Sequence, residues 1–84
     1  MYQEKEFLKA LMMLPDDKLL IQLHDKYSGI ILFQIANRCV EDGYINKDNV
    51  SFGLFDNGQH LTIKYSEPRL TEAGKQFLAE EISP

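Results

Sequence analysis

The segment VSFGLFDNGQHLTIKY, residues 50–65, constrains the fold of this chain more than any other stretch. Apolar and polar residues alternate in 50–55 and again in 60–65, which is typical of strands with one face against a core. Asn57 and Gly58 lie between the two segments, and both tolerate the positive φ angles of a two-residue hairpin turn. The segment therefore predicts an antiparallel β-hairpin. The alternation predicts an inner face made of Val50, Phe52, Leu54, Leu61, Ile63 and Tyr65.

A first helix is predicted over residues 2–14. Pro15 ends it, because the residue before a proline is pushed out of the helical region. Helical spacing predicts inward positions at Phe7, Leu8, Leu11, Met12 and Leu14. The same spacing predicts a solvent-facing side that carries Glu4, Lys5, Glu6 and Lys9.

Two further helices are predicted before the hairpin. Asp16 or Asp17 can cap the second helix by accepting a hydrogen bond from one of its free amide groups. The inner side of this helix is predicted to carry Leu19, Leu20, Leu23 and Tyr27. The third helix is predicted from about Ile30 to Asp42. Gly43 follows it, where a helix end favours the left-handed conformation that glycine adopts readily.

A last helix is predicted after the hairpin. Pro68 ends the second strand because it lacks an amide donor for the sheet, and Thr71 can cap the helix that follows. Gly74 lies early in this helix, which indicates close packing against another helix. The apolar side is predicted to carry Ala73, Phe77, Leu78 and Ile82. A short additional strand is expected near Tyr44 and Ile45.

The predicted elements follow the order helix, helix, helix, hairpin, helix within 84 residues. A chain of this length forms one domain, so residues 1–84 are predicted to share a single core. Three helices can cover the inner face of the hairpin and their own apolar sides only by packing together. The sequence thus predicts an α+β fold, in which a helix-turn-helix unit is followed by a hairpin and a C-terminal helix.

Two phrases resemble winged-helix sequences. IANRCVEDGYI, residues 35–45, is similar to the end of a recognition helix, and RLTEAGKQFL, residues 69–78, is similar to the helix after the wing. The second phrase resembles the L-T-x-x-G-x-x-[FY]-L phrase of small Gram-positive and phage winged-helix proteins, such as the YjcQ-like family. The resemblance covers residues 28–80 and implies a winged helix-turn-helix domain with the hairpin as its wing.

The resemblance also implies which side of the third helix faces outward. Inward positions of this helix in winged helices lie about four, eight and eleven residues before the glycine, here Cys39, Ile35 and Leu32. The implied function is that of a small bacterial or phage DNA-binding transcriptional regulator. The candidate nucleic-acid-binding residues are polar or basic side chains of the helix and the hairpin, namely Gln34, Asn37, Arg38, Lys47, His60 and Lys64.

The outward side of the third helix also carries Ile30, Ile31 and Phe33. Apolar side chains do not suit phosphates, which account for most protein–DNA hydrogen bonds. Either this helix is more buried than in DNA-binding proteins, or the three side chains form a partner-binding patch. The alternative function is therefore a winged helix that binds a protein or a second copy of itself, without binding DNA.

The charge balance argues against strong DNA binding. Nine lysines and arginines face thirteen acidic residues, so the net charge is −4. The hairpin turn, Asp56 to Gln59, carries no cation. Because phosphate contacts supply most non-specific affinity, a monomer is expected to bind DNA weakly. A homodimer would place two copies of the basic residues on one side, and the first and last helices are its expected interface.

The sequence offers no motif for catalysis, a cofactor or a metal. His24 and His60 have no partner at metal-ligand spacing, so we expect both to be surface histidines. Cys39 is the only cysteine, which excludes an intramolecular disulfide and suits a reducing cytoplasm. The longest apolar run, GIILF, is too short to span a membrane. We therefore expect a cytoplasmic protein that is not an enzyme.

Overall fold

The computed structural model describes residues 2–80, which form four helices and one two-stranded sheet. The elements are α1 (Tyr2–Met13), α2 (Lys18–Lys26), α3 (Gly29–Glu41), β1 (Val50–Phe55), β2 (His60–Tyr65) and α4 (Glu72–Glu80). Their order confirms the predicted α+β class. The expected Ile82 of the last helix lies outside the described residues. None of the four described helices is long and apolar enough to cross a membrane.

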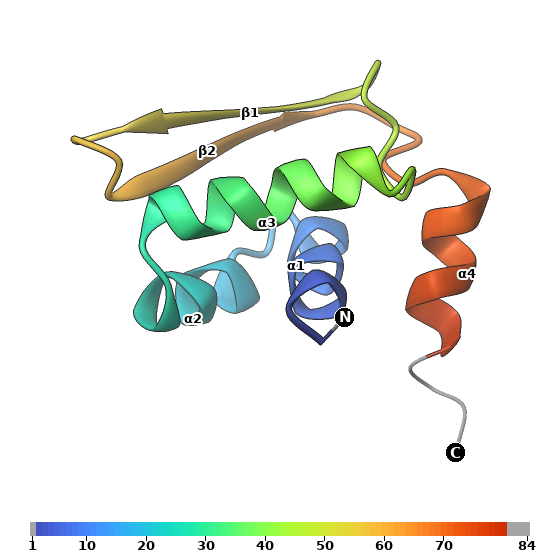
Figure 1. Ribbon diagram of the computed structural model, residues 1–84, viewed down its shortest axis with the longest axis horizontal. Coiled ribbons are helices and arrows are strands. Elements are labelled where there is room, and N and C mark those ends of the chain that lie inside the picture. The colour runs from blue at the N-terminus through green and yellow to red at the C-terminus, as the bar shows by residue number, and fades with distance from the viewer. Residues whose placement is uncertain (1, 81–84) are drawn as a thin grey trace.

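Helix α3 lies at the centre of the molecule (Figure 1). The hairpin runs along one side of α3, while α1 and α2 pack on the opposite side. Helix α4 lies beyond the C-terminal end of α3 and contacts α1. Ile45 and Leu70 form one antiparallel bridge, so the expected short strand is present as a single bridge. This arrangement leaves the start of α3 next to the hairpin turn.

The hairpin turns the predicted apolar face toward the core. Its register runs from Val50 opposite Tyr65 at the base to Phe55 opposite His60 beside the turn. The predicted inner residues belong to the core or pack against it, except Leu54, which is exposed near the turn. The alternation therefore identified which face of the hairpin meets α3.

The hairpin turn is wider than predicted. Asn57 and Gly58 lie at its centre with φ angles of 56° and 80°, as the hairpin signal required. Asp56 also has a positive φ of 57°, so the turn spans four residues, 56–59, and not two. The amide of Gln59 closes it by donating to the carbonyl of Asp56 at 3.0 Å.

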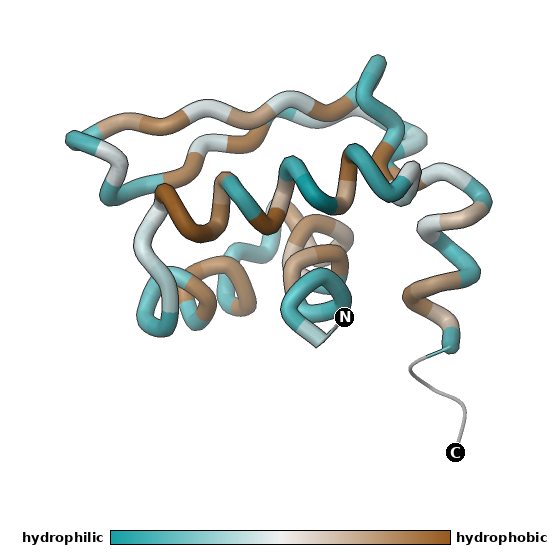
Figure 2. The backbone as a smooth tube through the Cα atoms, in the orientation of Figure 1, coloured by the Kyte–Doolittle hydropathy of each residue, from teal (hydrophilic) through white to brown (hydrophobic). Residues whose placement is uncertain are grey.

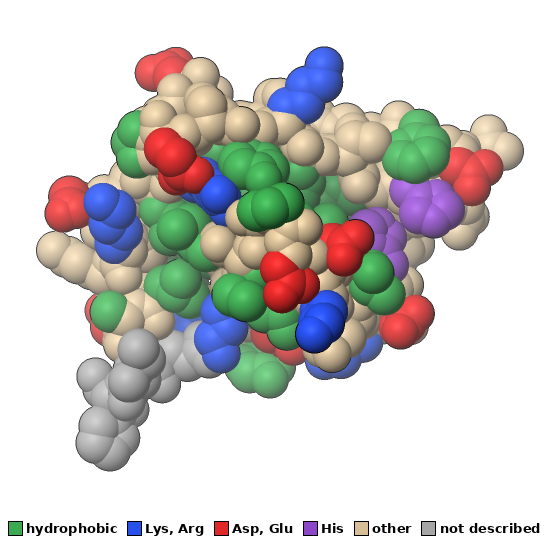
Figure 3. All heavy atoms as spheres, turned by 180° about the vertical axis from the view of Figure 1, so that it is seen from behind, with side chains coloured by type: hydrophobic (Ala, Val, Ile, Leu, Met, Phe, Trp, Pro, Cys, Tyr) green, Lys and Arg blue, Asp and Glu red, His purple; other side chains and the backbone are tan. Residues whose placement is uncertain are grey.

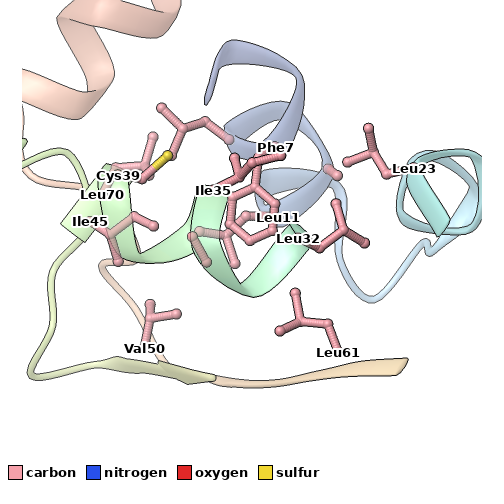
Figure 4. Close-up of a cluster of buried hydrophobic side chains, with 13 residues drawn as sticks. Phe7, Leu11, Leu23, Leu32, Ile35, Cys39, Ile45, Val50, Leu61 and Leu70 are labelled. Atoms are coloured by element: carbon pink, nitrogen blue, oxygen red, sulfur yellow. The ribbon is translucent and has the colours of Figure 1, made fainter. Parts of the chain in front are cut away.

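The core gathers side chains from all layers around α3 (Figure 4). Val50 and Leu61 project from the hairpin toward α3, while Leu23 approaches from α2. Cys39 is fully buried, as predicted for an inward position. The buried apolar residues are Phe7, Leu8, Ala10, Leu11, Leu23, Leu32, Ile35, Ala36, Cys39, Ile45, Val50, Leu61 and Leu70.

Two predictions for α1 were wrong. Glu4 was placed on the solvent side, but it is only 3% exposed. The first turns of α1 pack beneath the end of α3, where the Glu4 carbonyl lies 4.0 Å from the Cys39 sulfur. Met12 was placed in the core, but it is exposed and borders a shallow apolar hollow between α1 and α4. The inner side of α1 is therefore rotated from the predicted one, because α1 meets α3 and α4 together.

Polar side chains accept hydrogen bonds from free amides at the start of α2 and of α3. Asp17 occupies the N-cap position of α2 but makes no side-chain cap hydrogen bond, whereas Asp16 Oδ1 accepts from the amide of Lys18 at 3.1 Å. Ser28 Oγ accepts from the amide of Ile31 at 3.2 Å, at the start of α3. The cap of Ser28 fixes the first turn of α3, which is the part of the helix nearest the hairpin turn.

Helix α4 begins at the predicted cap and packs closely against the chain. Thr71 Oγ1 accepts from the amide of Gly74 at 3.0 Å, which confirms the predicted cap. A Cβ atom on Gly74 would collide with the carbonyl of Tyr44. The neighbour of Gly74 is thus the backbone that follows α3, and the expectation of a neighbouring helix was wrong.

Candidate functional site

The start of α3 and the hairpin turn form one continuous surface. A Cβ atom on Gly29 would lie 2.6 Å from the carbonyl oxygen of Gly58, so the two backbones are in direct contact. A Cβ atom on Gly58 would lie 2.7 Å from Cγ1 of Ile30. Only glycine fits at either position without a shift. We call the surface formed by residues 29–31 and 56–59 the turn–helix surface.

Apolar side chains occupy the helical half of the turn–helix surface. Ile30 is 48% exposed and Ile31 is 39% exposed, as predicted for outward positions. Figure 2 shows the start of α3 as a strongly hydrophobic stretch. Phe33 was predicted beside them, but it is half-buried and packs against the core. It lies one helical turn after Gly29, on the side of α3 that faces the hairpin.

The polar candidates of α3 lie one to two turns further along the helix. Gln34, Asn37 and Arg38 are all exposed, as predicted. Arg38 Nη2 donates to Oε1 of Gln3 at 3.2 Å, so its guanidinium is held against α1. The outward side of α3 therefore changes from apolar at its start to polar in its second half.

The basic candidates of the hairpin lie far from the turn. Lys47 and Lys64 are exposed and line a shared hollow of about 250 Å³ at the hairpin base. Lys64 follows His60 by four residues, which corresponds to about 13 Å along a strand. His60 is exposed beside the turn, and its Nδ1 lies 3.3 Å from Oδ2 of Asp56. The six predicted nucleic-acid-binding residues therefore form three separate groups and not one patch.

His24 was expected on the surface, but it is half-buried and bonded through both ring nitrogens. Nδ1 lies 3.1 Å from the carbonyl oxygen of Leu20, and Nε2 accepts from the amide of Leu61 at 3.2 Å. His24 thereby joins α2 to the hairpin. A sequence signal existed, because Leu20, His24 and Tyr27 recur at i, i+4 and i+7 on one side of a helix.

A buried carboxyl lies near the other end of α3. Burial raises the pKa of Glu4 above its ordinary value of 4.5, and a hydrogen bond and repulsion from Asp42 raise it further. The Arg38 guanidinium opposes this rise in the pKa. Burial likewise raises the pKa of the Cys39 thiol to about 12. Within residues 2–80, no group of three or more His, Cys, Asp or Glu side chains is placed to hold a metal ion.

No family model, curated protein or solved structure matches this chain. Three surfaces of the chain are therefore the candidates for function: the turn–helix surface, the polar side of α3 and the hairpin base.

Proposed function

We propose that this chain is a winged helix, in which α2 and α3 form the helix-turn-helix unit and the hairpin forms the wing. Only residues 27 and 28 separate α2 from α3, which makes a tight connection between the two helices. The hairpin turn lies against the start of α3, so helix and turn would meet the same partner. The phrase at residues 69–78 supports a place among the small bacterial and phage winged helices, such as the YjcQ-like group.

The function that this geometry supports best is binding of a protein partner through the turn–helix surface. The observation that carries the proposal is the exposure of Ile30 and Ile31 at the start of α3. Burying the exposed part of each side chain stabilises a complex by about 1 kcal/mol, since roughly half of each isoleucine is already covered. A phosphate backbone offers no such gain to an isoleucine, so the pair is better suited to an apolar protein surface.

The charges around the surface indicate the chemistry of the partner. Asp56 is the charged side chain of the hairpin turn, and the chain as a whole carries a net charge of −4. An acidic turn repels nucleic acid and attracts basic protein segments. We therefore expect a partner segment that combines apolar side chains with lysine or arginine.

Selection of binders from a random displayed-peptide library tests this proposal. The chain should enrich peptides that pair apolar side chains with lysine or arginine. Ile30→Asp combined with Ile31→Asp should weaken the binding of those peptides by at least about 30-fold, given the apolar area lost. Met13→Asp is the matched control, because Met13 has the same 48% exposure as Ile30 but ends α1. Equal loss of binding in the control, or none in the double variant, would contradict the proposal.

A DNA-binding regulator is the second candidate, supported by the exposure of Gln34, Asn37 and Arg38 on the outward side of α3. These residue types pair with phosphates and base edges. Titration of random duplex DNA at several salt concentrations separates the two candidates. We expect weak binding and release of fewer than about six counterions per protomer, because few basic residues face one side. A steeper salt dependence would favour the regulator.

Substitution of Asp56 in the hairpin turn gives a sharper test of whether the partner is a protein or DNA. Asp56→Lys replaces the acidic side chain of the turn with a cation, and Asp56→Asn removes the charge without adding one. If both Asp56→Asn and Asp56→Lys bind DNA while the parent does not, repulsion by the Asp56 carboxylate excludes DNA from the parent, and the protein-binding function gains support. If the parent already binds DNA at physiological salt, the protein-binding proposal loses its main argument.

We also propose that two copies associate through α1 and α4. A shallow, almost wholly apolar hollow of about 320 Å³ lies between these helices and is lined by Met12, Leu70, Lys75, Leu78 and Ala79. Light scattering should then give about twice the 9.7 kDa mass of one chain. Met12→Asp should restore the monomer mass, whereas Thr62→Asp on the open face of the hairpin should not.

A further inference from the structure

One imidazole connects the helical part of the molecule to the hairpin. His24 lies in the second half of α2, and its Nε2 accepts the amide proton of Leu61 on β2 at 3.2 Å. Because this amide bonds to His24 and not to β1, it belongs to the open edge of the sheet. An edge amide without a partner is available to water or to another strand, so His24 closes this position.

The contact made by Nδ1 determines which nitrogen of the neutral His24 ring carries the proton. Nδ1 of His24 lies 3.1 Å from the carbonyl oxygen of Leu20, and a carbonyl can only accept. The proton of the neutral ring is therefore on Nδ1, which leaves Nε2 free to accept from Leu61. A protonated ring would carry a hydrogen on both nitrogens and would place one donor against another. The bond to Leu61 therefore exists only while His24 is neutral.

The groups around His24 reinforce this dependence. The His60 ring lies 5.7 Å from the His24 ring, and the histidines lie side by side on the face shown in Figure 3. Asp56 faces His60 from the hairpin turn, with its Oδ2 3.3 Å from Nδ1 of His60. On α2 the adjacent charge is the exposed Asp25. On α1, Glu6 pairs with Lys26 and Lys5 lies over the Phe77 ring. Lys9 lines a hollow together with Gln22. On α3, Arg38 and Glu41 lie late in the helix, away from His24.

We propose that His24 is a proton-operated latch that holds the hairpin, and with it the turn, against the helices. The neutral ring holds the Leu61 edge through Nε2. In acid the released form can take up a proton that the latched form cannot accept, so latching weakens. Release loosens the turn where Gly58 touches Gly29 and Ile30. The inference depends on the hairpin geometry and not on the proposed function.

Hydrogen exchange followed by NMR on the full chain tests the latch. The protection factor of the Leu61 amide, which is corrected for the intrinsic effect of pH, should fall roughly fivefold between pH 8 and pH 5, as expected for one net hydrogen bond. The amide of Ile35, in the core of α3, should keep its protection and serve as the internal reference. An unchanged Leu61 protection factor would overturn the proposal.

Two variants identify the sensor. His24→Gln keeps an acceptor near the position of Nε2 but does not titrate, so the Leu61 protection factor should stay constant with pH. His60→Gln removes the neighbouring imidazole and should retain most of the fall. A fall in His24→Gln equal to that of the parent would disprove the role of His24. Loss of the fall in His60→Gln would assign the sensing to His60 and would equally reject the latch.

Discussion

Nη1 of Arg69 lies 2.8 Å from the carbonyl oxygen of Leu11 and joins the segment after the hairpin to the end of α1. The same nitrogen lies 3.0 Å from the carbonyl of Leu14 and 3.3 Å from that of Met12. Tyr65 covers the guanidinium at 4.1 Å. One side chain thus satisfies carbonyls that the end of a helix leaves without internal partners, and its positive charge suits that end of the helix dipole.

Replacing Arg69 should therefore destabilise the fold. Arg69→Ala is expected to lower the free energy of unfolding by about 2–4 kcal/mol, because hydrogen bonds to a charged group contribute about 1.5–3 kcal/mol each with partial overlap. Arg69→Lys should recover part of this, since an ammonium cannot reproduce the guanidinium fork. Urea unfolding measures the change. Lys75→Ala, which removes an exposed cation of α4, should stay within about 0.5 kcal/mol of the parent.

Because Gly74 contacts Tyr44, it is expected to be an exception to the rule that alanine stabilises a helix relative to glycine. Alanine in place of a helical glycine usually stabilises by about 1 kcal/mol. Gly74→Ala should instead destabilise by about 1–3 kcal/mol, because its Cβ would collide with the Tyr44 carbonyl. Thermal unfolding gives the sign directly. The neighbouring exposed Ala73→Gly should cost about 1 kcal/mol, as the ordinary rule states; a higher melting temperature for Gly74→Ala would show that the contact is loose.

Burial of Glu4 predicts a pH-dependent gain from removing its charge. The pKa of Glu4 is raised by burial and by Asp42, so the folded chain holds this proton to higher pH than the unfolded chain. The stability contributed by the protonated group is present in acid and is lost as the pH rises through the folded pKa. Glu4→Gln should therefore become more stable than the parent as the pH rises from 4 to 8.

Urea unfolding across that pH range measures the difference between the two chains. The exposed Glu72→Gln of α4 is the matched control and should show a small difference that does not grow with pH. A Glu4→Gln chain that is less stable than the parent at pH 8 would mean that the ionised carboxylate is paired in the fold.

Cys39 should be unreactive in the folded chain. Its side chain is fully buried and its pKa is raised to about 12, so thiolate is scarce at pH 8. Ellman's reagent should modify the thiol at least about 1,000-fold more slowly in the native chain than in concentrated urea. Absorbance at fixed reagent concentration follows the reaction. Rapid modification without denaturant would show that the end of α3 opens easily.

The elements of the fold could be predicted because their signals are local. The positive φ angles of Asn57 and Gly58, the cap at Thr71 and the left-handed Gly43 each depend on residues close by in the sequence, and the structure confirms all three. The widening of the turn from two residues to four could not be predicted, because the positive φ of Asp56 carries no signal as strong as the Asn57-Gly58 pair.

The errors share a different cause. Glu4, Met12 and Phe33 were misplaced because a single helical pattern does not reveal that α1 contacts α2, α3 and α4, or that the hairpin covers one side of α3. His24 and Arg69 were missed because each binds backbone from a distant part of the chain, Leu61 and Leu11 respectively. Backbone partners leave no residue-type signal in a sequence.

The exposure of individual candidate residues was predicted from the sequence, but their arrangement in space was not. The exposure of Ile30, Ile31 and Arg38 followed correctly from the position of Gly43. The distance between the turn and Lys64 did not, because it depends on the direction in which the hairpin runs along α3. That direction separates the cations from the apolar start of the helix, which supports the proposed protein partner over DNA.

The contact between Gly29 and Gly58 separates the residues that build the scaffold from the exposed residues of the proposed binding surface. Backbone atoms set the spacing of helix and turn, so the exposed side chains at 31 and 59 do not help to fix it. These positions are free to vary in evolution, or in a designed library, while the two glycines stay fixed. A single framework of this kind can acquire new binding specificities by exchanging a few side chains without refolding.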